Sequence, residues 1–212
     1  MYKIDKILIG THNKGKFKEI SDLLPKKIRK ISPNDLNIKS PIEDGKTFLE
    51  NSQIKANFFC KKSNLVTLSD DSGLEIECLD GKPGIFSARW AKDFGNFENA
   101  MSEILKKMNE VNKNNKKKNN KAKFICSLTI QWPDGKKISE IGEIKGNISV
   151  QKGKNGFGYD PIFIPYGYSK TFAEMEYKNK LSIDHRYIAY RKLEKKIKTY
   201  FWQMYCFLTG KY

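Results

Sequence analysis

The stretch "LVTLSDDSGLEIE", residues 65–77, places two adjacent carboxylates directly after an apolar run. The run predicts a buried strand, and the alternating residues that follow predict a second strand after a turn. Neighbouring like charges repel, so Asp70 and Asp71 need compensation from water, a nearby cation or a metal ion. A carboxylate pair at a strand end suits the hard Mg²⁺ ion, and an Asx turn in "DDSG" is the alternative.

A second group of acids surrounds the start of a predicted helix. In "IEDGKTFLENSQIKANFFC", residues 42–60, Thr47 and Glu50 have the spacing of a capping box, which marks a helix N-terminus. Glu43, Asp44 and Glu50 are the further acids that could join the carboxylate pair around a metal ion.

The segment "ILIGTHNKGKF", residues 7–17, predicts a strand, a loop and the start of a helix. Gly10, Gly15 and Lys16 match the phosphate-binding pattern GxxxxGK. Phe17 stands where that pattern needs a hydroxyl for magnesium, so this loop cannot hold the metal in the usual way. Backbone N–H groups and lysines at a helix N-terminus still suit phosphate oxygens, and a plain turn with a capped helix is the alternative.

The rest of the chain alternates strands with helices, which indicates an α/β domain with a mixed sheet. Amphipathic spacing predicts a helix over 97–108, and the turn "PDG" at 133–135 predicts a hairpin. The other predicted elements are strands at 124–132, 137–144 and 146–150, a short strand within "PIFIP", and a basic helix over about 184–207.

Two later segments carry groups that suit a flat base, "GFGYDPIF" at 156–163 and "NKLSIDHR" at 179–186. Phe157 and Tyr159 lie beside glycines and could present a ring, and base stacking of this kind contributes about 1–3 kcal/mol. The donors that could read a base edge are Lys180, His185 and Arg186. A turn anchored by an aromatic ring, and a structural His-Arg pair, are the alternatives.

The formal net charge is +16, from 40 Lys and Arg against 24 Asp and Glu. Much of the excess lies in "KKMNEVNKNNKKKNNKAK", residues 106–123, whose low complexity predicts a flexible surface insertion over 109–123. This charge makes a basic nucleic-acid-binding module an alternative function, but no RNA-recognition or helix-turn-helix motif is present. A nucleoside triphosphate suits the charge equally well, and a P-loop ATPase is a further alternative that Phe17 disfavours.

The four cysteines, at positions 60, 78, 126 and 206, include no CxxC pair, and His12 and His185 are the only histidines. These counts argue against a zinc cluster and favour reduced thiols. The first apolar run, "ILIG", is too short for a signal peptide or a membrane span. We therefore expect a soluble, cytoplasmic protein without a membrane partner.

Five motifs in register make the chain resemble the inosine triphosphate pyrophosphatase family. The resemblance covers nearly the whole chain, so residues 1–212 are expected to form a single domain of this family. The motifs are "THNKGKFKEI" at 11–20, "EDGKTFLENSQIKA" at 43–56, "SDDSGLEIECLDGKPGIFSARWA" at 69–91, "GFGYDPIFIPYGYSKTFAEM" at 156–175 and "KLSIDHRYIA" at 180–189.

The resemblance implies an elongated two-lobed α/β fold around a long mixed β-sheet flanked by helices, with the active-site cleft between the lobes, and a homodimer. It implies hydrolysis of a purine nucleoside triphosphate between the α and β phosphates, giving monophosphate and pyrophosphate. The implied substrates are ITP, dITP and XTP, and the implied cofactor is Mg²⁺, with Mn²⁺ as a substitute. A nucleic-acid partner is not expected.

The resemblance also assigns roles to individual residues. It implies that Asp71 accepts a proton from water, and that Glu43, Asp70 and Asp71 surround the metal. The substrate-binding residues that it implies are Thr11, His12, Asn13, Lys14, Gly15, Lys16, Ser72, Phe157, Gly158, Tyr159, Asp160, Lys180, His185 and Arg186. Two positions depart from the family's pattern: His12 replaces the usual Gly, and Asp184 replaces the usual Ser.

Overall fold

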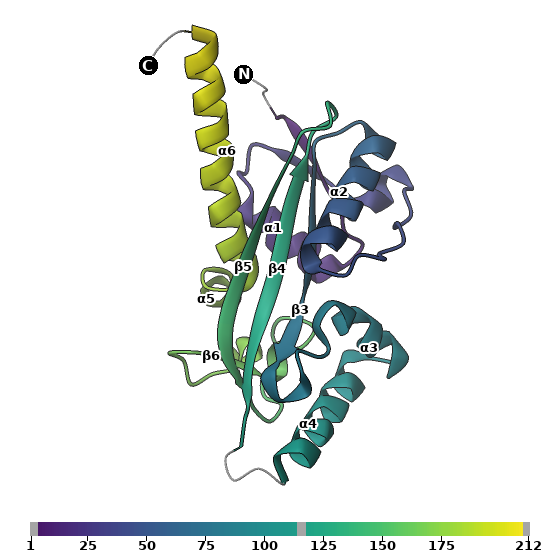
Figure 1. The fold of residues 1–212 in the computed structure, drawn as a ribbon, viewed down its shortest axis with the longest axis vertical. Helices are drawn as coiled ribbons and strands as arrows, with labels where there is room; N and C mark the ends of the chain where they lie inside the picture. Colours follow the sequence, from purple (N-terminus) through teal and green to yellow (C-terminus); the bar gives the residue numbers. More distant parts are fainter. Residues whose placement is uncertain (1–3, 114–117, 210–212) are drawn as a thin grey trace. The chain divides into compact units, whose positions relative to one another are not determined.

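The computed structural model of the chain describes residues 4–113 and 118–209, with the backbone alone for 201–209. Within these residues, six strands form one mixed sheet in the order β2-β1-β3-β4-β5-β6, with helices around it (Figure 1). This arrangement confirms the predicted α/β class. The strands are β1 (Lys6–Ile9), β2 (Arg29–Ile31), β3 (Thr67–Ile76), β4 (Lys121–Gln131), β5 (Lys137–Ile148) and β6 (Phe163–Pro165).

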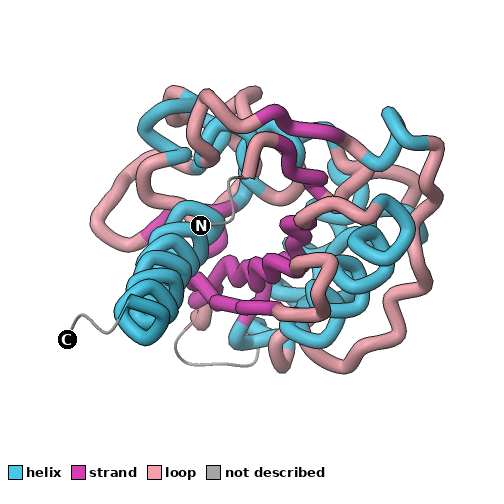
Figure 2. The backbone as a smooth tube through the Cα atoms, turned by 90° about the horizontal axis from the view of Figure 1, so that it is seen from above, coloured by secondary structure: helices cyan, strands magenta, loops and turns pink. Residues whose placement is uncertain are grey.

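Helices and strands alternate from β1 to β3, whereas β4, β5 and β6 follow one another with no α-helix between them; Figure 2 distinguishes the two kinds of element by colour. The helices are α1 (Lys14–Leu23), α2 (Phe48–Ser63), α3 (Ser87–Asp93), α4 (Phe97–Lys113), α5 (Tyr177–Leu181) and α6 (His185–Thr209). Strand β1 pairs in parallel with β2 and β3, whereas β5 pairs antiparallel with β6. The parallel pairs are possible because α1 and α2 supply the long crossover connections that such pairs need.

The described chain divides into two compact units. The first unit contains residues up to 71, 127–142 and from 186 onward, and the second contains 72–126 and 143–185. Strands β3, β4 and β5 each contribute residues to both units.

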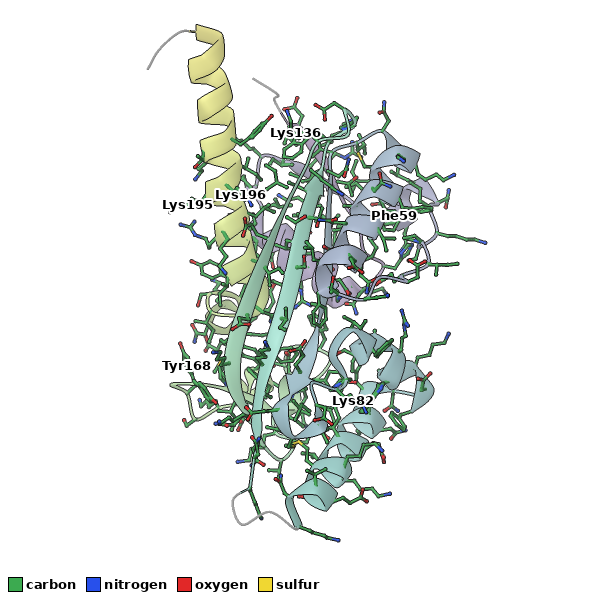
Figure 3. All side chains as sticks on the ribbon, viewed as in Figure 1. Phe59, Lys82, Lys136, Tyr168, Lys195 and Lys196 are labelled. Atoms are coloured by element: carbon green, nitrogen blue, oxygen red, sulfur yellow. The ribbon has the colours of Figure 1, made fainter. Side chains whose placement is uncertain are left out.

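The core of the first unit surrounds β1. Ile7, Leu8 and Ile9 are fully buried, as are Ile20 of α1 and Phe59 of α2, which Figure 3 labels. These positions follow the predicted apolar strand and the apolar faces of the flanking helices. Helix α6 lies beside β5 (Figure 1), where Lys192 Nζ donates to the Ile141 carbonyl at 2.8 Å.

Helix α2 is also joined to β4 by buried hydroxyl groups. Ser52 Oγ lies 2.9 Å from Ser127 Oγ and 2.8 Å from Thr129 Oγ1, and all three side chains are fully buried. A buried hydroxyl without a partner would be costly, so these hydrogen bonds fix the position of α2 against the sheet. This matters for the site described below, because α2 carries two of its residues.

The second unit has its own apolar core. The amphipathic face predicted on residues 97–108 is buried in α4 through Met101, Ile104 and Met108. The rings of Phe124 and Phe163 pack edge to face in the same core, with their centroids 4.7 Å apart. Figure 1 shows α3 and α4 adjacent to one another in this unit.

Two sequence predictions about strands were wrong. No turn separates "LVTLSD" from "SGLEIECL", because β3 runs unbroken from Thr67 to Ile76. Asp70 and Asp71 therefore lie inside a strand, where neighbouring basic side chains compensate them and no turn is needed to expose them to water. Residues 146–148 are likewise the end of β5 and not a third strand.

Only one of the two hydrogen bonds of the capping box predicted at the start of α2 forms. The Thr47 side chain accepts from the Glu50 N–H at 3.1 Å, as predicted. The Glu50 carboxylate accepts instead from the Lys46 N–H at 2.6 Å, one residue earlier than a capping box requires.

Regular structure occupies both ends of segment 109–123, which was predicted as a flexible insertion. Helix α4 continues to Lys113 and β4 begins at Lys121, and residues 114–117 lie outside the described residues. Cys60 and Cys78 are free thiols. None of the helices in the described part of the chain has both the length and the apolar character to cross a membrane.

Candidate active site

The two central acids of β3 belong to the first unit and have different partners. Successive side chains of a strand point to opposite faces, which separates the two carboxylates although they are neighbours in sequence. Asp70 Oδ2 lies 3.0 Å from Lys16 Nζ on α1 and 3.6 Å from Arg186 Nε on α6. Asp71 faces α2, where its Oδ1 lies 3.5 Å from Lys55 Nζ.

Asp70 is fully buried and remains charged because of these cations. Burial acts to raise the pKa of its carboxyl, but Lys16 and Arg186 outweigh this and hold the pKa well below its usual range. A buried carboxylate compensated in this way is a fixed negative charge at neutral pH.

Asp71 is in a different electrostatic state. Burial raises the pKa of its carboxyl above the ordinary value, and the ammonium group of Lys55 acts in the opposite direction. Lys55 Nζ also lies 3.1 Å from Glu43 Oε2, so one lysine joins two of the acids that the sequence predicted around a metal. A carboxylate with a raised pKa accepts a proton more readily than an ordinary one, which suits a general base.

The loop before α1 offers backbone and side-chain donors. Asn13 is the N-cap residue of α1 and accepts from the Lys16 N–H at 3.0 Å, while its own N–H donates to Thr11 Oγ1 at 3.2 Å. Lys14 and Gly15 form the first turn of the helix. The N-terminus of α1 is therefore ordered with its positive dipole end at the loop, as phosphate binding requires.

Gly10 allows this loop to approach β3. A Cβ atom there would lie 2.1 Å from Ser69 Oγ and 2.7 Å from the Phe59 ring, so no larger residue fits without displacement. Its N–H donates to the Leu68 carbonyl at 2.8 Å, which places the loop directly beside the strand that carries the acids.

His12 departs from the family's usual glycine without straining the turn. It is not among the residues with a positive φ, so its position does not require glycine. Its ring nitrogens lie 3.0 Å from the Ile38 carbonyl and 2.7 Å from Ser40 Oγ. These contacts tie the loop before α1 to the 38–40 segment.

The base-binding candidates of the second unit meet around Asp160. Lys180 Nζ lies 2.6 Å from Asp160 Oδ2, and this carboxylate also accepts from the Phe157 N–H at 2.9 Å. The same ammonium group lies 4.9 Å from the centroid of the Phe157 ring. Gly156 has a φ of +74°, and a Cβ there would overlap the Asp160 carboxylate. The structure thus brings Phe157, Asp160 and Lys180 together.

Other predicted residues of this unit have structural contacts. The Tyr159 hydroxyl donates to the Ser87 carbonyl at 2.9 Å, and burial raises its pKa, so its ring anchors the loop. Gly158, with a φ of +66°, precedes it in the same loop. The His185 ring stacks on Phe124 with centroids 4.9 Å apart. Ser72 is half-buried in β3, directly after Asp71.

Arg186 lies with the acids of the first unit. Its Nη1 donates to Glu19 Oε2 at 2.8 Å, and both side chains are buried. Sequence reasoning missed Glu19, and it also missed Asn51 and Lys55, which contact Asp71. The spacing of the last two, one helical turn apart in "ENSQIK", is a signal that could have found them.

The donor set around Asp71 fits Mg²⁺. Among the described residues, no three or more His, Cys, Asp or Glu side chains form a metal cluster. Mg²⁺ does not need one, because it usually takes one or two carboxylates and completes its shell with water and substrate phosphates. Asp71 and Glu43 supply such oxygens beside Lys55, so the residues present suit this ion.

Comparison with known proteins identifies the relationship. A family model described as "Ham1 family" matches residues 7–196. The chain belongs to the Ham1 family. Two relatives, each named dITP/XTP pyrophosphatase, come from Zymomonas mobilis and Oceanobacillus iheyensis. The first is 39% identical over 190 residues, covering 89% of this chain and 90% of the relative; the second is 41% identical over 198 residues, covering 92% and 98%.

Solved Ham1 structures share the fold. A HAM1 protein from Coxiella burnetii matches with a TM-score of 0.81 and 30% sequence identity, covering 92% of this chain and 98% of that one. The Staphylococcus aureus Ham1 protein matches with a TM-score of 0.78 and 32% identity over the same shares of both chains. These matches confirm the family resemblance that the five sequence motifs predicted.

Proposed function

We propose that this chain hydrolyses deaminated purine nucleoside triphosphates, namely dITP, XTP and ITP, to the monophosphate and pyrophosphate. The observation that carries the proposal is the buried carboxylate pair of β3 held by Lys16 and Lys55. The name of the two relatives, dITP/XTP pyrophosphatase, supports dITP and XTP as substrates. The reaction consumes one water and breaks the bond between the α and β phosphates.

The N-terminal end of α1 binds the triphosphate in this proposal. Thr11, Asn13 and Lys16 lie at the N-terminus of α1, where backbone N–H groups and the helix dipole favour anions. A triphosphate carries roughly four negative charges, so lysine at this position also offsets charge that develops at the α-phosphorus.

Asp71 acts as the general base. It accepts the proton of the water that attacks the α-phosphorus, while pyrophosphate leaves from the opposite side. Its raised pKa makes its carboxylate a stronger base, and the ammonium group of Lys55 favours its ionised form. Both effects follow from burial beside one cation.

Mg²⁺ is the proposed cofactor, with Mn²⁺ as a substitute, and Asp71 and Glu43 are its proposed ligands with Asp70 close by. When bound, the ion would supply positive charge that stabilises the phosphates in the transition state. Within the described residues of this cluster, four carboxylates face three basic groups, which leaves one excess negative charge to favour a cation.

Phe157, Lys180 and His185 recognise the base in this proposal. Phe157 offers a ring for stacking, and Lys180 and His185 are the proposed donors to the 6-oxo group. The amino group of adenine is itself a donor, so it would leave the donors of the site unpaired. Sites of this kind discriminate between two substrates by roughly 10²–10⁵-fold. A base-reading role for Arg186 stays a prediction, because its described contacts are with Glu19 and Asp70.

A substrate panel with an isotope label tests the proposal. Purified protein with Mg²⁺ is given dITP, XTP, ITP, ATP or GTP in ¹⁸O-labelled water, and pyrophosphate and monophosphate are measured. We expect equal amounts of both products from the 6-oxo, deaminated substrates, with the label in the monophosphate. Orthophosphate as the sole phosphate product, or ATP hydrolysed as fast as dITP, would reject the proposal.

We also propose that the chain acts as a homodimer on the free nucleotide pool of the cytoplasm. The substrate class supports this location, because free nucleoside triphosphates are the substrates of nucleic-acid synthesis there. Light scattering after size-exclusion chromatography measures the mass directly, and a particle of the chain's own 24.5 kDa would reject the dimer.

A further inference from the structure

Asn51 is a buried amide in the first turns of α2, and only 1% of it is exposed. Its Oδ1 accepts from the Gly45 N–H at 2.9 Å, and its Nδ2 donates to Asp71 Oδ2 at 3.1 Å. A backbone N–H can only donate, so the amide oxygen must face Gly45 and the amide nitrogen must face Asp71. The direction of both hydrogen bonds is therefore fixed by chemistry.

Both oxygens of the Asp71 carboxylate are contacted by side chains of α2. Oδ2 accepts from Asn51, and Oδ1 lies 3.5 Å from Lys55 Nζ. The two holding residues are four positions apart on α2, so they project from the same face of the helix. Contact at both oxygens restricts rotation of the carboxylate about its Cβ–Cγ bond, which a single contact would leave possible.

The other end of the amide fixes the loop before α2. A Cβ atom at Gly45 would lie 2.6 Å from Asn51 Oδ1, so glycine is what allows the loop to approach this closely. The loop carries Glu43, which reaches Lys55 at 3.1 Å. One amide thus joins the segment bearing Glu43 to the strand bearing Asp71.

A purely structural role does not explain the choice of residue. Asparagine is a weak helix former, and a buried amide is costly unless its polar atoms are bonded. An apolar side chain could fill the same volume, but it could not donate to a carboxylate and accept from a backbone N–H at once.

We infer that Asn51 is a positioning residue, which orients the Asp71 carboxylate for proton transfer while it secures the Glu43 loop. The inference rests on the proposed function, because it assigns Asn51 a part in that reaction through Asp71. Asn51 does not touch the reacting atoms itself. Its contribution is to hold the base in the geometry that transfer requires, and a misplacement of about 1 Å can cost about 100-fold in rate.

Two substitutions separate the two ends of the amide. Asn51→Asp keeps an oxygen for the Gly45 N–H but replaces the donor toward Asp71 with a second acceptor. Asn51→Ala removes both hydrogen bonds. The matched control is Asn112→Ala, because the Asn112 amide is also buried and also bridges backbone groups, those of Asn119, and its hydrogen bonds within the described residues involve no acid.

The experiment measures kcat and KM for dITP, the thermal midpoint of unfolding, and crystal structures of both Asn51 variants. We expect kcat to fall about 100-fold in both, with KM within about threefold of the wild type. In Asn51→Asp the 43–46 loop should stay in place while the Asp71 carboxylate turns away from its wild-type orientation. Asn112→Ala should lose thermal stability but keep its kcat.

The outcomes distinguish the alternatives. An Asn51→Asp enzyme with nearly wild-type kcat and a restored loop would show that Asn51 only secures the loop, and would overturn the inference. Should Asn51→Asp fail to fold, a folded Asn51→Ala enzyme with unchanged kcat overturns it equally. If the wild type and Asn112→Ala both release no pyrophosphate from dITP, the proposed function is wrong and the role of Asn51 in it is rejected as well.

Discussion

The ammonium group of Lys16 lies 3.0 Å from Asp70 Oδ2, and the carboxylate that it contacts is fully buried in β3. Lys16 is also the lysine of the GxxxxGK phosphate-binding pattern, at the N-terminus of α1. One lysine therefore stabilises a buried charge and stands where the proposed function places a phosphate. Loss of this side chain should affect both the stability of the fold and the affinity for substrate.

Lys16→Met should destabilise the protein because it removes a partner from a buried charge. We expect the free energy of unfolding to fall by about 1–3 kcal/mol, since Arg186 still compensates Asp70 in part. Urea unfolding measures the change. Lys18→Met is the matched control, because Lys18 lies on the same helix but pairs with Asp22 at an exposed site, where such pairs contribute about 0–1 kcal/mol. Equal midpoints of urea unfolding for Lys16→Met and Lys18→Met would contradict the prediction.

The same pair predicts how stability depends on pH. The folded pKa of Asp70 is lowered, so the unfolded chain binds its proton at a higher pH than the folded protein does. The stabilisation is complete above the unfolded pKa of about 3.9 and is lost as the pH falls toward the lowered folded pKa. Lys16→Met should show a smaller loss of unfolding free energy between pH 6 and pH 3 than the wild type. If unfolding free energy fell with pH equally in the two proteins, the Lys16–Asp70 pair would not be the origin of this pH dependence.

Local patterns were sufficient to predict much of the fold. The apolar run before "THNKG" predicted β1, and helical spacing after it predicted α1. The amphipathic spacing of residues 97–108 predicted α4, and "PDG" predicted the turn between β4 and β5. These features depend on neighbours in sequence, so a sequence displays them directly.

The candidate site was less predictable because its electrostatics depend on distant residues. "DDSG" has the composition of a turn, yet β3 passes through it, and Lys16, Lys55 and Arg186 compensate its acids. Nothing in the local sequence tells which basic residues will reach a given acid. The link from Asn51 to Asp71 is hidden for the same reason.

Asp71→Asn tests the proposed general base. The amide has nearly the same shape but cannot accept the proton of the attacking water, so kcat for dITP should fall by about 100-fold or more. Far-UV circular dichroism checks that the fold is kept. Asp93→Asn, at an exposed position on α3, should keep wild-type turnover. A turnover number for Asp71→Asn close to that of the wild type would remove this carboxylate from the mechanism.

Removal of divalent ions should abolish activity. With EDTA in excess, a triphosphate meets two carboxylates, Asp71 and Glu43, that share the single positive charge of Lys55, and like charges oppose its binding. We expect pyrophosphate release from dITP to stop and to return when Mg²⁺ or Mn²⁺ is added beyond the chelator. Sodium chloride of matched ionic strength is the control for screening. Turnover that continues unchanged in EDTA would show that the lysines alone suffice.

Phe157→Ala tests base stacking in the second unit. Loss of the ring should lower kcat/KM for dITP about 10–100-fold, which corresponds to about 1–3 kcal/mol of stacking. Phe157→Tyr keeps a ring and should restore most of the activity. Tyr168→Ala is the control, because Tyr168 is an exposed aromatic of the same unit (Figure 3). Stacking tolerates any base, so the ratio of dITP to ATP hydrolysis should stay constant in Phe157→Ala. That ratio should fall instead in Lys180→Met, because Lys180 is a proposed donor to the 6-oxo group. If kcat/KM were unchanged in Phe157→Ala, the ring would have only a structural role in the loop around Asp160.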